Sequence, residues 1–192
     1  MKQELEIEFK NLVSEKDFHK IMDTFQLKED QLKKQTNHYF DTPDFSLKAQ
    51  RSALRIRHIE EGYVLTLKQP SQGHLLESHE ILTDTVSREM ISSSFFPEGG
   101  VRELVEQMGI SPKEIRYLGS LTTYRTQVAY KSGLLFFDRS HYLGTIDYEI
   151  EYECDDDKSG AAIFSALMDE LSIPIVKTEN KIQRFFNFKQ QQ

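Results

Sequence analysis

Polar and apolar residues alternate one by one in seven segments of this chain. A period of two is typical of β-strands with one polar and one apolar face. The segments are residues 4–10, 53–59, 63–69, 75–83, 121–131, 134–141 and 147–153. Short breaks at 60–62 (Glu-Glu-Gly) and 132–133 (Ser-Gly) predict hairpin turns. The pattern therefore constrains the chain to a largely antiparallel sheet.

Three further segments have the apolar spacing of an amphipathic helix. They are residues 14–25, 101–108 and 163–171. Ser14 and Asp17 resemble a helix cap at the start of the first segment, and Gly109 and Pro174 follow the second and the third as stops. We therefore predict one α+β domain over residues 1–192, with helices flanking the sheet and two similar halves.

The composition is that of an ordinary globular protein. The 192 residues are enough to bury a core, and 38% hydrophobic and 29% charged residues exclude both a disordered chain and a membrane span. The 24 Lys and Arg against 31 Asp and Glu give a net charge of −7. This balance argues against binding along an extended nucleic acid or an anionic membrane.

The start of the chain, MKQELEIEFK, has no apolar run after a basic stretch. We therefore expect no leader peptide and a cytoplasmic location. Cys154 is the single cysteine, and the six histidines have no spacing typical of metal ligands on one helix. Any metal would then be a hard ion held by oxygen.

The charges on the polar faces are sorted by sign from segment to segment. The acidic faces carry Glu4, Glu6 and Glu8, then Asp147, Glu149, Glu151 and Glu153, and the basic faces carry Arg55 and Arg57, Lys68, and Arg125. On a single strand such a face is most simply a solvated surface. Five sorted strands favour one charged lumen instead, because like charges in line repel unless opposite charges or a metal relieve them. Carboxylates with a divalent cation and basic groups with a polyanion are the combination that phosphoryl chemistry needs.

The opening residues Glu-Ile-Glu-Phe-Lys at 6–10 form a Glu-x-Glu-x-Lys motif. This motif resembles the signature of the CYTH superfamily, also called triphosphate tunnel metalloenzymes. Further similar segments are NHYFDTPD at 37–44, LRIR at 54–57, LTLK at 65–68, YEIEYE at 148–153 and KTENKIQRFF at 177–186. The set covers nearly the whole chain and is most similar to the compact, single-domain bacterial members.

The resemblance implies an eight-stranded antiparallel β-barrel that forms a tunnel, and hydrolysis of a triphosphate tail with Mg²⁺ or Mn²⁺. It implies catalytic roles for Glu6, Glu8, Lys10 and Glu80. The implied metal ligands are Glu6, Glu8, Asp138, Glu149 and Glu151. The implied phosphate-binding residues are Lys10, Arg55, Arg57, Lys68, Arg125 and Lys181. Arg suits phosphate because its guanidinium can donate two hydrogen bonds to two phosphate oxygens at once, while Lys acts as a point charge.

Some of these assignments have alternatives. Glu77 and Glu80 point to opposite faces of their segment, so only one can face the tunnel, and we favour Glu80. Asp138 is either a metal ligand or a turn residue. Lys177, Lys181 and Arg184 share one face at helical spacing and either close the tunnel or are ordinary charges on a last helix; of the three we favour Lys181. The orientation of three late residues stays open: Glu149, Glu151 and Glu153.

The first functional hypothesis is an inorganic triphosphatase that converts tripolyphosphate, a small molecule, to diphosphate and phosphate. Thiamine triphosphatase is the nearest enzyme alternative, although relatives specialised for thiamine use Trp and this chain has none. Adenylyl cyclase activity is a further alternative. From a different class, the chain could be a regulatory module that binds polyphosphate or a nucleotide without turnover. A tunnel with a polar interior leaves its outside apolar, so helices or a second copy of the chain in a homodimer would cover it.

Overall fold

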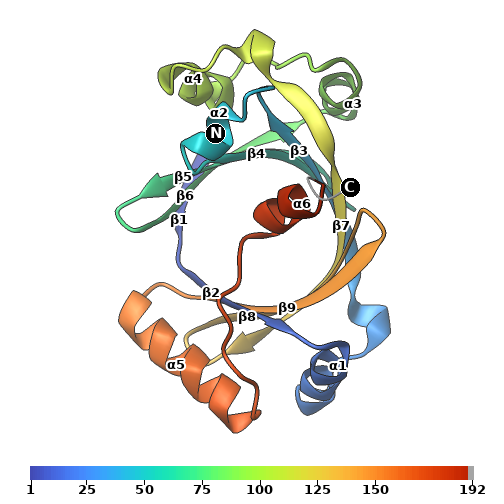
Figure 1. Cartoon of the computed structure of the whole chain (residues 1–192), viewed down its shortest axis with the longest axis vertical. Helices are drawn as coiled ribbons and strands as arrows, with labels where there is room; N and C mark the ends of the chain where they lie inside the picture. The colour runs from blue at the N-terminus through green and yellow to red at the C-terminus, as the bar shows by residue number, and fades with distance from the viewer. Residues whose placement is uncertain (190–192) are drawn as a thin grey trace. The chain divides into compact units, whose positions relative to one another are not determined.

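The computed structural model describes residues 1–189 of the chain (Figure 1). Contacts within the chain define two compact units, each drawn from two separate stretches of sequence. Unit 1 comprises Met1–Glu6 and Gln35–Leu121, and unit 2 comprises Ile7–Lys34 and Thr122–Gln192. Neither unit is a continuous segment of the sequence. The single domain over residues 1–192 stays a prediction. The predicted two halves have a counterpart in these two units.

The sheet of unit 1 has the antiparallel strand order β1-β6-β5-β4-β3. The strands are β1 (Lys2–Glu6), β3 (Lys33–Asp41), β4 (Ala53–Ile59), β5 (Gly62–Ser71) and β6 (His74–Leu82). The hairpin predicted at 60–62 is confirmed, because Ile59 pairs with Gly62 across the turn. A second turn at Gln72 and Gly73, which have φ values of 49° and 89°, joins β5 to β6 and sets their register.

Helices cover one face of the unit 1 sheet (Figure 1). They are α2 (Ser46–Ala49), α3 (Asp84–Ser93) and α4 (Gly100–Gln107), followed by a 3₁₀ turn at Pro112–Glu114. The buried core between helices and sheet contains Leu47, Leu54, Ile56, Leu65, Leu67, Met90, Val101 and Val105. Because Leu54 and Ile56 face this core, Arg55 and Arg57 point to the other face of β4. The predicted helix at 101–108 is confirmed as α4.

The sheet of unit 2 has the antiparallel strand order β7-β8-β9-β2. The strands are β2 (Glu8–Val13), β7 (Arg116–Tyr130), which begins in unit 1, β8 (Gly133–Tyr142) and β9 (Thr145–Glu153). The hairpin predicted at 132–133 is confirmed, because Tyr130 pairs with Gly133. A Cβ at Gly133 would lie 2.2 Å from the carbonyl oxygen of Glu153, so only glycine fits this close approach.

Two helices of unit 2 cover its apolar face, and a third lies on the other side of β2, β8 and β9 (Figure 1). They are α1 (Glu15–Thr24), α5 (Asp157–Glu170) and α6 (Lys181–Lys189), with a 3₁₀ turn at Glu29–Gln31. The core beneath α1 and α5 includes Phe18, Ile21, Leu135, Phe137, Ile150, Tyr152, Phe164 and Met168. The two predicted helices at 14–25 and 163–171 are confirmed, and Ser14 caps α1 by accepting the amide of Asp17.

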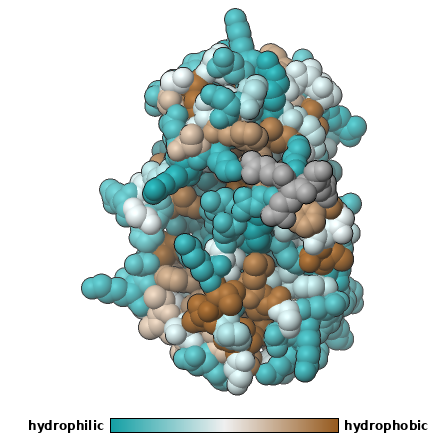
Figure 2. Space-filling view, viewed as in Figure 1, coloured by the Kyte–Doolittle hydropathy of each residue, from teal (hydrophilic) through white to brown (hydrophobic). Residues whose placement is uncertain are grey.

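The predicted α+β class with an antiparallel sheet and flanking helices is confirmed. The described residues form nine strands where the sequence predicts seven segments, because the opening acidic run is divided at Ile7 into β1 and β2, and β3 was not predicted. No helix between residues 1 and 189 is both long and apolar enough to cross a lipid bilayer. Figure 2 shows hydrophobic side chains gathered on the surface of unit 2. Ile175 and Val176, which lie between α5 and α6 in the chain, are 55% and 42% exposed.

Candidate functional site

Buried charges gather on the polar face of β8 and β9 in unit 2. We call this group the β8–β9 cluster; its members are Arg125, Asp138, Glu149, Glu151 and Lys181. Asp138 and Glu149 are fully buried, and Glu151 is 5% exposed. The sheet register brings them together, because Arg125 pairs with Asp138 and Asp138 pairs with Glu149 on successive strands.

The two cations of the β8–β9 cluster are shared among its carboxylates. Arg125 donates hydrogen bonds from Nε and Nη2 to the two oxygens of Asp138, both at 2.6 Å, and also pairs with Glu151. Lys181 reaches from α6, with its Nζ 2.7 Å from Asp138 Oδ2 and 2.6 Å from Glu151 Oε1, and it also pairs with Glu149. The buried carboxylates are therefore satisfied by ion pairs, as burial requires.

The three carboxylates of the β8–β9 cluster have pKa values that are shifted in different directions. Burial raises the pKa of Glu149 to about 7, and its hydrogen bond with Glu151 adds to this effect. For Asp138 and Glu151 burial acts in the same direction, but the neighbouring cations outweigh it and hold both pKa values below the ordinary range. Lys181 and Arg125 have raised pKa values, because the attraction of the carboxylates exceeds the effect of burial. Glu149 is thus the one member that takes up a proton near neutral pH.

Lys10 on β2 extends this cluster. Its Nζ pairs with Glu8 and donates to Asn180 Oδ1 at 2.8 Å, and the backbone register places Lys10 opposite Glu151. Burial alone would lower the pKa of Lys10, but Glu8, Glu151 and Glu149 raise it. Lys10 therefore stays a cation in this environment.

The carboxylates of the cluster offer a donor set for a metal ion. One oxygen each from Asp138, Glu149 and Glu151 lies within 4.8 Å of the others. Carboxylate oxygens are the donors that hard divalent cations such as Mg²⁺ prefer. These residues therefore fit the kind of ion that the sequence predicts.

Unit 1 holds a second charged group on its polar face. We call it the β5–β6 cluster; its members are Glu6, Arg55, Lys68, Glu77 and His79. Lys68 Nζ lies 2.8 and 2.6 Å from the two oxygens of Glu6 and also pairs with Glu77. Arg55 Nη2 is 3.5 Å from Glu77 Oε1. Burial would raise the pKa of Glu77, but its contacts with His79, Arg55 and Lys68 lower it far below the ordinary range.

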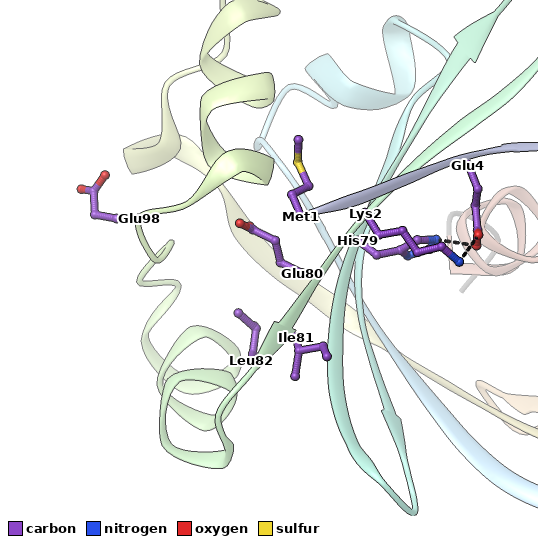
Figure 3. A pocket seen from close by; sticks show the side chains of 8 residues that line it. All are labelled: Met1, Lys2, Glu4, His79, Glu80, Ile81, Leu82 and Glu98. Atoms are coloured by element: carbon purple, nitrogen blue, oxygen red, sulfur yellow. Dashed lines mark hydrogen bonds and ion pairs between the residues drawn. The ribbon is translucent and has the colours of Figure 1, made fainter.

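His79 adds a ring nitrogen to the β5–β6 cluster that the sequence did not predict. Its Nε2 is 3.0 Å from Glu77 Oε2 and 3.1 Å from Glu4 Oε1, and its Nδ1 is 3.0 Å from Thr66 Oγ1. Figure 3 shows His79, Glu4 and Lys2 side by side, with the Glu4 carboxylate contacting both neighbours. The alternation along β6 puts His79 on the same face as Glu77.

The preference for Glu80 over Glu77 is wrong. Glu80 points away from His79 (Figure 3) and accepts hydrogen bonds from the amides of Gly100 (2.8 Å) and Val101 (3.1 Å) at the start of α4. The reason is the register: Glu80 lies opposite Leu65 of the apolar face, whereas Glu77 lies opposite Lys68. Glu80 therefore caps a helix, and Glu77 belongs to the charged face.

The remaining predicted residues have the following positions. Arg57 lies beside Asn37, with its Nε 3.0 Å from Asn37 Oδ1. Glu8 pairs with Lys10. Asp138 lies within β8 and not in a turn, and Lys181 is the first residue of α6. The sequence analysis missed Asn180, which accepts a hydrogen bond from Lys10. It considered Arg184, which helical spacing places on the same face as Lys181, but preferred Lys181; in the structure both residues contact Glu149.

Comparison with known proteins identifies the family. The CYTH domain model matches residues 4–186. The chain is 42% identical over 189 residues to the "Putative triphosphatase YjbK" of Bacillus subtilis (strain 168), and the match covers 98% of each chain. The chain therefore belongs to the CYTH family.

Solved structures agree with this assignment. A "putative adenylate cyclase" from Bacillus halodurans is 41% identical with a TM-score of 0.94, covering 97% of this chain and 100% of that chain. A "putative adenylyl cyclase" from Hippeastrum, described as having a dominant triphosphatase activity, is 24% identical with a TM-score of 0.80, covering 95% and 96%. The first similarity, over nearly the whole chain, agrees with the family assignment, and the second concerns the fold alone.

Proposed function

We propose that this chain is a divalent-metal-dependent triphosphatase that hydrolyses tripolyphosphate to diphosphate and phosphate. The β8–β9 cluster carries the proposal, because three buried carboxylates share one site with Arg125 and Lys181. Burial of so many charges adds little to stability, because the cost of removing them from water offsets the attraction between them. The name of the Bacillus subtilis relative supports the same activity.

The proposed reaction adds water across a phosphoanhydride bond. The water oxygen bonds to the terminal phosphorus, the bond to the bridging oxygen breaks, and that oxygen leaves with the diphosphate while the water proton passes to a carboxylate or to solvent. Arg125, Lys181 and Lys10 would hold phosphate oxygens, and a carboxylate would orient the water. A Mg²⁺ or Mn²⁺ ion bound by Asp138, Glu149 and Glu151 would supply stabilisation of the charge that develops on the phosphate.

A second candidate is adenylyl cyclase activity, because the similar Bacillus halodurans protein is named a putative adenylate cyclase. It would act on the same triphosphate tail but release diphosphate and a cyclic nucleotide. The two activities are separable by their products, since a triphosphatase releases phosphate and a cyclase does not.

The test is a substrate panel with purified protein. Tripolyphosphate, thiamine triphosphate and ATP are supplied with Mg²⁺ or Mn²⁺ and scored for phosphate and for cyclic AMP. We expect phosphate, with the highest kcat/KM on tripolyphosphate, and none after the metal is chelated. Tight binding of tripolyphosphate without any turnover would identify a binding module instead.

A matched pair of arginine variants ties the activity to the cluster. Arg125→Gln should lower kcat/KM on the order of 10²-fold, the usual cost of removing one electrostatic contact in a site. Arg139→Gln is the control, because Arg139 lies on β8 beside Asp138 but pairs with the half-exposed Glu29. Equal activity of the two variants would contradict the proposed site.

A further inference from the structure

Arg184 on α6 is buried against the acidic strand β9. Its Nε lies 2.9 Å from Asp147 Oδ2, and its Nη1 lies 2.6 Å from Glu149 Oε2. The residue is only 9% exposed. Arg184 thus bridges two carboxylates that are two residues apart on one face of β9 and would otherwise repel each other.

The same guanidinium also holds the start of α6. Arg184 Nη1 donates to the backbone oxygen of Glu179 at 2.5 Å. One side chain therefore fastens the first turn of α6 to the sheet. Asp147 is fixed from the other side, because Tyr142 donates its hydroxyl to Asp147 Oδ2 at 2.8 Å.

The turn that Arg184 fastens carries two groups of the candidate site. Lys181 lies three residues before Arg184 and takes the other oxygen of Glu149, while Arg184 takes Oε2. Asn180 accepts a hydrogen bond from Lys10 at 2.8 Å. Lys has a long, flexible stem, so the position of its ammonium depends on where the backbone beneath it is held.

Arg184 itself differs from these groups in its contacts. Its side chain contacts Asp147, Glu149 and the Glu179 carbonyl, whereas Lys181 contacts all three carboxylates of the β8–β9 cluster. We propose that Arg184 is a positioning residue, which anchors the start of α6 to Asp147 and Glu149 and thereby places Lys181, and through Asn180 also Lys10, for binding of the triphosphate. This inference rests on the proposed function.

The decisive experiment compares the kinetics of four variants on tripolyphosphate. Arg184→Gln should raise KM about tenfold with kcat changed less than about threefold, because it weakens binding that is common to substrate and transition state. Arg184→Lys keeps the charge and one of the two carboxylate contacts, so it should recover part of the loss. Asp147→Asn should change KM in the same direction but less. Lys177→Gln is the matched control, since Lys177 is an exposed cation in the same segment.

Each outcome decides the inference. Thermal unfolding of every variant shows whether it is folded, and Asp147→Asn serves in place of Arg184→Gln if the latter does not fold. A KM for Arg184→Gln equal to that of Lys177→Gln overturns the inference, and so does an equal loss in Arg184→Lys and Arg184→Gln. A wild-type chain that releases no phosphate contradicts the proposed function instead, so the two failures are distinguishable.

Discussion

Lys68 and Glu77 lie directly opposite one another on β5 and β6, and their side chains form an ion pair. Glu80, three residues further along β6, lies on the opposite face and caps α4. Both glutamates are within one strand, yet one joins two cations and the other joins two backbone amides. This division gives a direct test of which glutamate affects activity.

We expect Glu77→Gln to affect turnover and Glu80→Ala to affect stability. Lys68 and Arg55 are among the phosphate-binding residues that the family motifs imply, and both pair with Glu77. Glu77→Gln removes the charge that orients them, so turnover should fall about 10- to 100-fold, the usual cost of losing a partner that orients a binding group. Glu80→Ala should leave kcat near the wild-type value but lower the free energy of unfolding by about 1 kcal/mol, through loss of the α4 cap. Phosphate release and urea denaturation measure the two effects. A large loss of kcat in Glu80→Ala would restore the assignment made from the sequence.

The pKa of Glu149 predicts a pH-dependent stability. Burial raises this pKa from 4.5 to about 7 in the folded chain. Between these two values the folded state binds the extra proton, so the free energy of unfolding should fall as the pH rises through this window. The stabilisation that comes from the raised pKa of Glu149 is fully present below about pH 4.5 and is lost as the pH rises through about 7.

Glu149→Gln isolates this effect because glutamine does not titrate. The difference in unfolding free energy between wild type and variant should change by on the order of 1.4 kcal/mol per pH unit within the window. Urea denaturation at pH 5, 6 and 7 in buffer with a chelator measures it. A difference that stays constant over these three values would show that Glu149 is already ionised at pH 5.

Local patterns in the sequence were sufficient for part of the site. The period of two places Arg55 and Arg57 opposite the core residues Leu54 and Ile56, and this alternation is visible without a structure. The two-residue turn at Gln72 and Gly73 also determines that Lys68 faces Glu77. Reading that register from the turn would have corrected the choice of Glu80.

The features that the sequence analysis did not predict depend on packing and on contacts between residues far apart in the chain. β3 buries the polar residues Gln35 and Asn37, so its alternation of polar and apolar residues is hidden. The function of Glu80 depends on where α4 begins, 20 residues further along the chain. The contact of Arg184 with Asp147 spans 37 residues, and no local pattern reports it.

Removal of the hydroxyl group should have opposite effects on stability at two buried tyrosines. The Tyr152 hydroxyl is buried without a hydrogen-bond partner among residues 1–189, whereas the Tyr142 hydroxyl donates to Asp147 at 2.8 Å. Tyr152→Phe should therefore leave stability unchanged or raise it by up to about 1 kcal/mol, since an unsatisfied buried group is removed. Tyr142→Phe should cost about 1.5 kcal/mol, because it removes a hydrogen bond to a charged group. Urea denaturation of both variants checks the pair, and a greater loss in Tyr152→Phe would indicate a hydrogen bond to its hydroxyl.

Lys181 and a divalent cation should compete for the same oxygens. The ammonium contacts all three carboxylates that could hold the ion, namely Asp138, Glu149 and Glu151. Lys181→Met removes this positive charge, so Mn²⁺ should bind on the order of tenfold more tightly in the absence of substrate, because like charges a few Å apart repel by about 1 to 4 kcal/mol. Turnover should fall in the same variant, since Lys181 would no longer hold phosphate. Calorimetric titration with Mn²⁺ alone measures the affinity, with Lys177→Met as the control. Unchanged or weaker Mn²⁺ binding in Lys181→Met would mean that the metal is held elsewhere, because an ion at these carboxylates must feel the loss of the neighbouring charge.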